Sequence, residues 1–349
     1  MGRKKLGAGR SAVSPAKAEK IDVGGSQKVV ARCVPPFLLP TGSTLLNLAL
    51  SDNPYGGYVK GTIVIIVGDR SAGKTFVLWT LFAELLRLFY KYMMIYDEPE
   101  AALQFALKKL FGEKIGNVEL NITSSTIQDF YRNVMEQVGT GKPFVYGLDS
   151  WDSLTSEEEE ERDGVGKGGY KTEKAIASSE IFRQIVRKVK DTESLVAVIF
   201  QTRVNIGVTF GKKKTRSGGN APGFYATHEM WLRIVKHLKR KEREVGVLVE
   251  VNVEKNKFTG KLRKVQFPIF FDYGIDDVGS MVDWLLLEKF WKKDKNTINC
   301  GDDFPKATRE KLITYIEDNN LEGKLIEIVA EGWQEIEKDI QTDRKPRYE

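Results

Sequence analysis

The stretch GDRSAGKT, at residues 68–75, constrains the fold more than any other part of this chain. It matches the pattern Gly-x-x-x-x-Gly-Lys-Ser/Thr and lies between the β-branched run TIVIIV and a stretch with helical periodicity. In that setting the backbone N–H groups can curl around phosphate oxygens, and the helix start adds its partial positive charge. We therefore expect a strand, a phosphate-binding loop and a helix in succession. The loop residues are Gly68, Asp69, Arg70, Ser71, Ala72, Gly73, Lys74 and Thr75.

The side chains of this loop indicate a nucleoside triphosphate with magnesium as the ligand. Lys74 would reach the β and γ phosphates of ATP, and the Thr75 hydroxyl would hold Mg²⁺. A second apolar run, PFVYGLD at residues 143–149, ends in Asp149. Ligands of open α/β sheets sit at the carboxyl ends of strands, so Asp149 is expected beside the loop. There it would hold Mg²⁺ through a water molecule.

Three acids follow another expected strand end, in MIYDEPEAAL. Asp97, Glu98 or Glu100 could orient the water that attacks the nucleotide. We favour Glu98. The alternative for the other two is a negatively charged first turn of a helix, with Pro99 near its start.

Short β-rich runs alternate with helical patterns between residues 62 and 201. We expect strands at 62–68, 92–97, 118–123, 143–149 and 194–201, and helices at 74–90, 99–111, 127–138 and 173–190. This alternation predicts βαβ units and a mostly parallel twisted sheet covered by helices on both faces. Strand-like runs between 228 and 271 predict an antiparallel extension, and amphipathic patterns from about 279 predict helices. We divide the chain into a basic N-terminal arm or oligomerisation segment (1–35), an α/β core (36–278) and a small C-terminal domain (279–349).

The bulk composition favours a cytoplasmic protein with a polyanionic partner. The 349 residues carry a formal net charge of +6. Two cysteines, Cys33 and Cys300, give no disulfide framework and favour a reducing compartment. Apolar runs are too short to cross a bilayer, and the basic N-terminus lacks the apolar segment of a secretory signal.

Five segments occur in the order and spacing of RecA-type recombinases, and the chain resembles that family over roughly residues 36–284. They are LPTGSTLLNLAL (39–50), GDRSAGKT (68–75), GLDSWDSLT (147–155), QTRVNIGVTFG with SGGNAPGFYA (201–226) and VEKNKFTGKLRKVQF (253–267). The resemblance implies a RecA-like P-loop ATPase core that uses ATP and Mg²⁺. It also implies filaments on single-stranded DNA, DNA-stimulated ATP hydrolysis, homologous pairing with double-stranded DNA and strand exchange in DNA recombination and repair.

By this resemblance, Gln201 begins a DNA-binding loop whose order depends on ATP. Its amide would donate to the γ-phosphate and lose that partner after hydrolysis, which makes it a two-state sensor. Cations in the loop can neutralise DNA phosphates, and an aromatic ring can face the bases. The alternative is a solvated, charged hairpin tip. The expected DNA-contacting residues are Arg203, Asn205, Phe210, Lys212, Lys213, Lys214, Arg216, Gly218, Gly219 and Asn220.

The segment VEKNK matches the family at a site that acts on a neighbouring subunit. Lys255 and Lys257 are two residues apart, so on a strand they would point the same way. The resemblance implies that they reach the nucleotide of the neighbour in the manner of arginine fingers. It also places Phe271 near the neighbour's adenine and assigns Arg183 a DNA contact. The alternative for the lysines is a surface pair on a strand edge.

The chain departs from the family in several places. The first DNA-binding loop is expected after Asp149 but reads TSEEEEERDGVGKGGYKT, with an acidic run at 157–161. We interpret the run as a solvated tip, with Lys167 and Lys171 making any DNA contact. The alternative is a gate that blocks DNA until ATP or a partner moves it. Residues 27–34 could be a docking strand, and the C-terminus lacks an acidic tail. These departures indicate a diverged member and leave a phage origin, with a host-cell cytoplasmic location, open.

Two other functions compete with a recombinase. One is a hexameric helicase of the same core fold, which would need a ring and usually an arginine finger. The other is an ATP-switched structural or regulatory protein that binds single-stranded DNA with little turnover. The lysine pair and the SGGNA segment favour the recombinase. Its expected partners are single-stranded DNA, homologous double-stranded DNA, further copies of the chain, and loader or mediator proteins.

Overall fold

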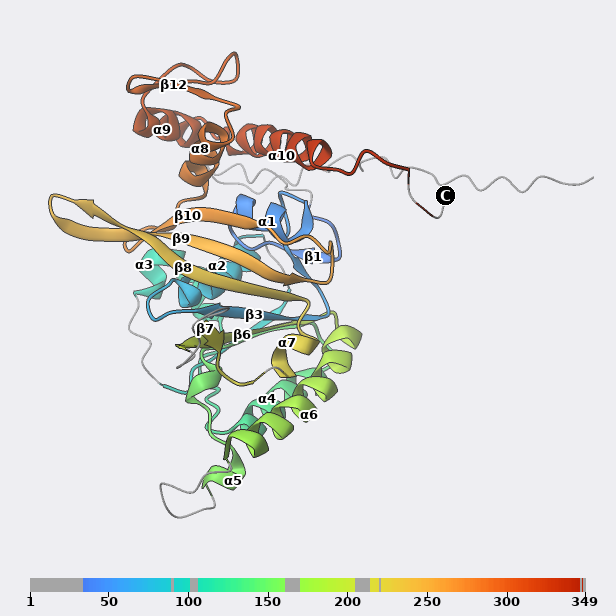
Figure 1. The fold of residues 1–349 in the computed structure, drawn as a ribbon. Helices are drawn as coiled ribbons and strands as arrows, with labels where there is room; N and C mark the ends of the chain where they lie inside the picture. The colour runs from blue at the N-terminus through green and yellow to red at the C-terminus, as the bar shows by residue number, and fades with distance from the viewer. Residues whose placement is uncertain are drawn as a thin grey trace, which may run out of the picture. The chain divides into compact units, whose positions relative to one another are not determined.

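The central sheet of the computed structural model is mostly parallel, with an antiparallel extension (Figure 1). The model describes residues 34–88, 91–100, 106–160, 170–204, 214–219, 221–345 and 347. In space the strands follow the order β11-β10-β9-β8-β3-β6-β5-β4, and those from β8 to β4 are parallel. This confirms the predicted fold class. The bounds are β3 (Thr62–Gly68), β4 (Met93–Asp97), β5 (Phe144–Leu148), β6 (Leu195–Val204), β8 (His228–Arg240), β9 (Arg243–Asn256), β10 (Lys264–Phe270) and β11 (Gly274–Ile275).

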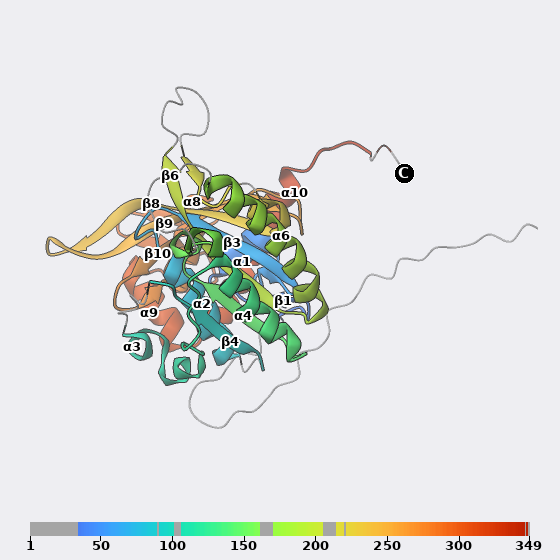
Figure 2. The ribbon, with the colours of Figure 1, turned by 90° about the horizontal axis from the view of Figure 1, so that it is seen from below.

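Two apolar cores cover the two faces of the sheet, because successive residues of a strand point to opposite sides. In β3, Ile63 belongs to the core with α4 and α6, whereas Val64 belongs to the core with α1, α2 and α8. Helices α4 and α6 lie side by side (Figure 2). A strand buried on both faces needs apolar residues throughout, which explains the run TIVIIV. The bounds are α1 (Thr44–Ser51), α2 (Lys74–Arg87), α4 (Ile127–Gly139), α6 (Tyr170–Asp191) and α8 (Asp277–Leu287), and a short pair joins β1 (Leu38–Leu39) to β2 (Tyr58–Val59).

The strand predicted at 118–123 was wrong. Only Glu119 bridges to β4, where its N–H donates to the Met94 carbonyl at 2.8 Å and its carbonyl accepts from Tyr96 N–H at 2.9 Å. Among the described residues of this segment, only Glu119 forms a bridge to β4, although Val118 and Ile122 pack against the apolar cores. The helix predicted at 99–111 is also shorter. Residues 99–100 form a turn, 101–105 lie outside the described residues, and only α3 (Leu107–Phe111) and the 3-10 helix η1 (Glu113–Asn117) follow.

The C-terminal helices pack on the core through α1. Asp52, which caps the end of α1, accepts hydrogen bonds from Trp333 Nε1 at 3.2 Å and from Lys261 Nζ at 2.7 Å. Residues Val34–Glu349 form one compact unit, and the predicted domain boundaries stay predictions. Among the described helices, none has the length and apolar character needed to span a membrane. The elements are α9 (Arg309–Asp318), α10 (Glu322–Asp339), and a hairpin of β12 (Lys292–Asp294) and β13 (Thr297–Asn299) that precedes α9.

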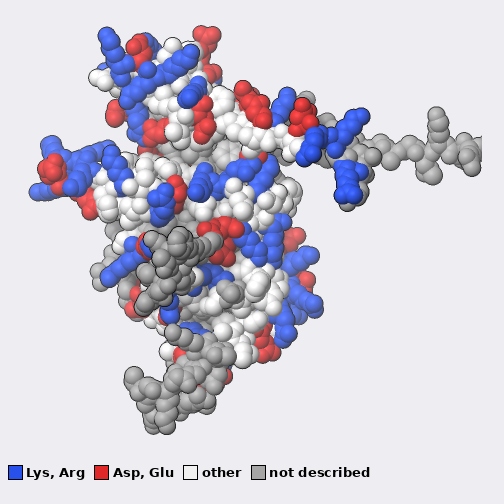
Figure 3. All heavy atoms as spheres, viewed as in Figure 1, with Lys and Arg blue, Asp and Glu red and all other residues white. Residues whose placement is uncertain are grey.

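Strands β8 and β9 extend beyond the sheet as a long hairpin with an exposed tip (Figure 1). In Figure 3 lysine and arginine side chains gather on this tip, at the left of the molecule. Strand signals in the sequence predicted both strands. They did not predict that the two strands project beyond the sheet, because this depends on where the neighbouring strands end. Such a surface attracts polyanions. Its exposed cations are Lys236, Lys239, Arg240, Lys241 and Arg243.

Candidate active site

The loop between β3 and α2 has the backbone shape of a phosphate cradle. Ser71 and Gly73 adopt positive φ values of 61° and 88°. A Cβ at Gly73 would also lie 2.5 Å from Ile269 Cδ1, so both the conformation and the space favour glycine. No side-chain hydrogen bond caps α2, which leaves its first N–H groups to bind phosphate oxygens.

Lys74 lies at the centre of this loop and is 8% exposed. Its Nζ donates to the carbonyl oxygens of Gly68 at 3.0 Å and Asp69 at 2.7 Å. Burial lowers the pKa of Lys74, and the nearby carboxylates of Asp149 and Asp152 oppose that shift. The ammonium group can turn from these carbonyls to phosphate oxygens, which carry more negative charge and form stronger hydrogen bonds.

Thr75 and Asp149 meet at the edge of the loop. The Thr75 hydroxyl donates to Asp149 Oδ2 at 2.6 Å, and the Tyr96 hydroxyl donates to the same oxygen at 3.1 Å. Burial raises the pKa of Asp149, while the hydrogen bonds from Thr75 and Tyr96 oppose the shift. Mg²⁺ prefers oxygen ligands and usually takes one or two from the protein beside substrate phosphates and waters. The hydroxyl and the carboxylate therefore fit Mg²⁺.

The three acids after β4 have different environments. Asp97 is fully buried, and it accepts hydrogen bonds from Ser124 N–H at 2.8 Å and from the hydroxyls of Ser124 and Tyr146 at 2.5 Å. Burial raises the pKa of Asp97. With both oxygens occupied and no solvent contact, Asp97 has a structural role. Glu98 is half-buried, and the exposed Glu100 accepts a hydrogen bond from Ser153.

Gln201 lies in register with Gly68 on the neighbouring strand, so β6 reaches the phosphate loop at this residue. The strand ends at Val204, beyond the predicted end at 201. The N–H of Gln201 donates to Asp152 Oδ2 at 2.7 Å, and its carbonyl accepts from Ser217 N–H at 3.1 Å. Its main chain is thus held while its side chain is exposed.

Strand β7 (Lys214–Arg216) returns the basic loop to the end of β6. The Arg216 side chain is 9% exposed, and its Nε lies 3.4 Å from Glu229 Oε1. Burial lowers the pKa of Arg216, and Glu229 opposes the shift. Arg216, which was predicted to contact DNA, is therefore directed into the protein in this structure.

The turn after β7 requires its two glycines. Gly218 and Gly219 have φ values of 74° and 70°. A Cβ at Gly218 would lie 2.8 Å from the ring of Phe200 and 2.9 Å from that of Trp151. Both effects exclude larger residues at Gly218, and the positive φ alone disfavours them at Gly219.

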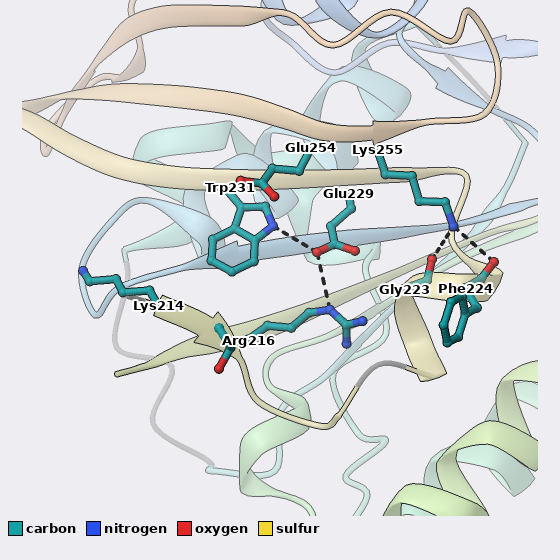
Figure 4. Close-up of a pocket in the computed structure, with 9 residues that line it drawn as sticks. Lys214, Arg216, Gly223, Phe224, Glu229, Trp231, Glu254 and Lys255 are labelled. Atoms are coloured by element: carbon teal, nitrogen blue, oxygen red, sulfur yellow. Dashed lines mark hydrogen bonds and ion pairs between the residues drawn. The ribbon is translucent and has the colours of Figure 1, made fainter. Parts of the chain in front are cut away.

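Lys255 and Lys257 converge on the end of α7 (Ala221–Tyr225), as Figure 4 shows for Lys255. Lys255 Nζ donates to the carbonyls of Gly223 and Phe224, the latter at 3.1 Å, and Lys257 Nζ donates to Phe224 at 2.7 Å. Burial, followed by the charge of Lys257, lowers the pKa of Lys255 to about 8. Lys255 also lines a pocket of about 450 Å³. Two ammonium groups that share a carbonyl acceptor, one of them at a pocket, are suited to take up phosphate oxygens instead.

The chain matches one family model, described as the RecA N-terminal domain, over residues 24–276. It belongs to the RecA family. Protein RecA of Bacteroides thetaiotaomicron is 31% identical over 297 residues, covering 83% of this chain and 87% of that protein. Protein RecA of Prochlorococcus marinus strain MIT 9303 is 29% identical over 301 residues, covering 83% and 74%. The homology is distant, and it identifies the chain as a RecA-family ATPase.

Other residues predicted from the RecA resemblance lie at the surface. Phe271 is 48% exposed just after β10. The Arg183 side chain is 66% exposed on α6, with Nη2 3.7 Å from a Glu180 oxygen. The Arg203 side chain is 61% exposed, with Nη2 3.7 Å from an Asp152 oxygen. Lys171 lies at the start of α6, and at this position only the backbone is described. Lys167, Asn205, Phe210, Lys212, Lys213 and Asn220 lie outside the described residues, as do 27–33 of the predicted docking strand.

The described part of the acidic run makes local contacts. Residues Glu157–Glu160 form the short helix α5. Glu157 accepts a hydrogen bond from Arg132 at 2.7 Å, and Glu159 accepts one from Ser156 N–H at 3.0 Å. These contacts give at least two of the glutamates a structural use in this RecA-family chain.

Sequence reasoning missed Tyr96, Asp152 and Glu229. Tyr96 donates to Asp149, Asp152 holds the main chain of Gln201, and Glu229 accepts from Trp231 Nε1 at 2.9 Å beside Arg216. The sequence holds one indication that Asp152 belongs to the site, because Asp152 follows closely after the predicted strand that ends at Asp149. Tyr96 and Glu229 lie inside strands, where no spacing marks them.

Proposed function

We propose that this RecA-family chain is an ATP-dependent recombinase that polymerises on single-stranded DNA. It then pairs that strand with homologous double-stranded DNA and exchanges strands. The observation that carries the proposal is the register of Gln201 with Gly68. The phosphate loop and the start of the basic loop are neighbours on adjacent strands, so nucleotide occupancy can change the loop.

Within one subunit, Lys74 would bind the β and γ phosphates, Thr75 would hold Mg²⁺ directly and Asp149 would hold it through a water. The ion neutralises charge on the phosphate oxygens when bound. Glu98 orients a water for attack on the γ-phosphorus and accepts its proton. The new P–O bond forms as the bond to the β–γ bridging oxygen breaks, and ADP and phosphate leave. The Gln201 amide donates to the γ-phosphate and loses that partner after hydrolysis.

Lys255 and Lys257 act on the nucleotide of a neighbouring copy, with Phe271 near its adenine. The convergence of both ammonium groups on the end of α7 supports this role. Two positive charges beside the γ-phosphate would stabilise the charge that develops during transfer. Hydrolysis therefore depends on assembly into a helical filament.

The DNA-binding surface comprises the basic loop and the helix surface around Arg183. Neutralising DNA phosphates makes binding independent of sequence and dependent on salt. Base pairing between strands then supplies the sequence specificity. The exposed cations of the β8–β9 tip offer further phosphate contacts. Loader or mediator proteins and a cytoplasmic location, in a bacterium or a phage host, belong to this proposal.

Negative-stain electron microscopy on long single-stranded DNA, with and without a slowly hydrolysed ATP analogue, tests the assembly. Continuous helical filaments that need the analogue are expected. Rings threaded on DNA would replace the recombinase with a helicase. Bare DNA in both samples would contradict assembly by this chain alone. Lys74→Ala should abolish ATP hydrolysis and filaments together, and retained hydrolysis would refute the site.

A further inference from the structure

The base of the basic loop is a two-stranded ribbon that begins one residue after Gln201. Strand β7 pairs with the end of β6, with Thr202 opposite Arg216 and Val204 opposite Lys214. Strand β7 therefore brings two cations, Lys214 and Arg216, to the ribbon, and Arg203 of β6 is a third.

Asp69 joins this ribbon to the phosphate loop. Its carboxylate accepts hydrogen bonds from the Thr202 hydroxyl and from Lys214 Nζ, the latter at 2.5 Å. Its own carbonyl accepts from Lys74 Nζ at 2.7 Å. One residue thus contacts the phosphate-binding lysine with its main chain and both strands of the ribbon with its side chain. Hydrogen bonds from Lys214 and Thr202 lower the pKa of Asp69, so its carboxylate is charged near neutral pH.

Arg216, the second cation of β7, is held differently from Lys214. The side chains of Arg216 and Glu229 are 9% and 13% exposed, whereas those of Lys214 and Asp69 are 49% and 43% exposed. Arg216 also donates to the Gly219 carbonyl at 2.7 Å. Figure 4 shows Lys214 extending away from Glu229, opposite in direction to Arg216. Arg216 is thus a buried anchor, and Lys214 is a solvent-accessible contact beside the phosphate loop.

We propose that Asp69 is a positioning residue that holds Lys214 at the rim of the phosphate site, where Lys214 responds to the third phosphate of the nucleotide. The proposal rests on the proposed function, since it needs a nucleoside triphosphate in the loop. The negative charge of the third phosphate, beside Asp69, increases the attraction for the Lys214 ammonium. It therefore favours the docked state, in which Lys214 and Thr202 of the ribbon contact Asp69. By linkage, docking of the ribbon raises the affinity for the triphosphate by the same factor. Lys214 then serves the nucleotide site rather than DNA directly.

Equilibrium titration with fluorescent ATP analogue and ADP, without DNA, tests the proposal. The variants are Asp69→Asn, Lys214→Gln and the double variant. The measured quantity is the ratio of triphosphate to diphosphate affinity. We expect each single variant to lower this ratio about 3- to 5-fold. This factor is small for two coupled binding sites, because the Asp69–Lys214 pair is partly exposed to solvent. The double variant should lower it no further, since both residues act through one contact. Lys311→Gln, which removes the same charge from an exposed position of α9 and keeps Lys214, should leave the ratio unchanged.

A second measurement uses the reciprocal effect. Binding of a fluorescent single-stranded oligonucleotide is titrated with and without the ATP analogue, and the ratio of the two affinities is compared between proteins. Asp69→Asn should reduce that ratio by a similar factor. A merely structural defect would weaken binding equally in both conditions and leave the ratio at the wild-type value.

The outcomes separate the two proposals. If the wild type binds no nucleotide, the proposed function fails. If the wild type binds and discriminates, but Asp69→Asn and Lys214→Gln keep its ratios, only the Asp69 inference is overturned. Additive losses in the double variant, or an equal loss in Lys311→Gln, would also overturn it.

Discussion

The Thr75 hydroxyl lies 2.6 Å from Asp149 Oδ2 and joins the start of α2 to the end of β5. Replacement of this carboxylate by an amide, Asp149→Asn, removes a charge that Mg²⁺ needs. We expect ATP turnover to fall about 100-fold or more, which corresponds to about 2.7 kcal/mol. Steady-state phosphate release measured over a range of Mg²⁺ concentrations tests this. Tyr96→Phe is the matched control, because it removes the other donor to Asp149 but keeps the carboxylate, and it should cost less than about tenfold. Equal losses in both variants would contradict a metal role for Asp149.

Asp97 and Glu98 are adjacent in sequence, and their substitutions should separate stability from turnover. Asp97→Asn brings amide hydrogens against the donors of Ser124 and Tyr146, so we expect a loss of about 2–3 kcal/mol in the free energy of unfolding. Glu98→Gln should keep the unfolding free energy within about 0.5 kcal/mol and lower turnover about 100-fold. Urea denaturation and single-turnover hydrolysis measure the two effects.

Glu100→Gln is the control for this assignment, because Glu100 is exposed after the same strand. Wild-type turnover in Glu98→Gln together with a large loss in Glu100→Gln would transfer the role of orienting water to Glu100. It would leave the structural role of Asp97 unaffected.

His228 makes stability depend on pH. It is fully buried at the start of β8, and burial lowers its pKa to about 4. The unfolded chain takes up this proton near pH 6.5, whereas the folded chain does so only near the lowered pKa. The stability contributed by neutral His228 is therefore present above that range and is lost as pH falls through it. We expect a loss of about 2 kcal/mol between about pH 7.5 and about pH 5.

Urea denaturation at those two pH values measures this loss. His228→Phe should reduce the pH dependence, because it keeps an aromatic ring of similar shape without the titrating group. Wild-type pH dependence in His228→Phe would contradict the assignment.

Glu337 holds α10 against the core. It is 5% exposed and accepts hydrogen bonds from Arg263 Nε at 2.6 Å and Nη2 at 2.7 Å, with Lys261 Nζ at 2.8 Å. Glu337→Gln would remove the carboxylate that Arg263 contacts and leave Lys261 with Asp52, so we expect a loss of about 1–3 kcal/mol in the free energy of unfolding. Glu335→Gln changes an exposed residue of the same helix and should stay within about 0.5 kcal/mol. Chemical denaturation of both variants tests the difference.

The acidic run at 157–161 should not limit DNA binding. Glu157 is already paired with Arg132, and Glu159 accepts a hydrogen bond from the N–H of Ser156, which directly precedes the short helix. Replacing all five glutamates with glutamine should change the affinity for single-stranded DNA less than about twofold at physiological salt, where charges beyond the Debye length of about 8 Å are screened. Fluorescence anisotropy with an oligonucleotide measures this. A rise of tenfold or more would instead support a gate.

The order of strands and helices could be predicted because its signals are local. The apolar run of β3, the glycines at 68 and 73 and the helical period after Lys74 all belong to one short segment. The strand expected at 118–123 was wrong for the same reason. VELNIT has the composition of a strand, but a strand also needs a neighbour, and only Glu119 reaches one.

The sequence by itself determined the phosphate loop, the carboxylate at the end of β5 and the fold class, since each depends on residue types at fixed spacing. Only the tertiary structure decided which polar groups meet. The sequence did not show that Asp97 is enclosed by hydrogen bonds from Ser124 and Tyr146, which give it a different environment from Glu98. Arg216 was expected at the DNA surface but is turned toward Glu229. Asp69 and Lys214 are 145 positions apart along the chain. The pairing of such distant side chains depends on strand register and on which positions the core leaves solvent-exposed, and no local spacing records either.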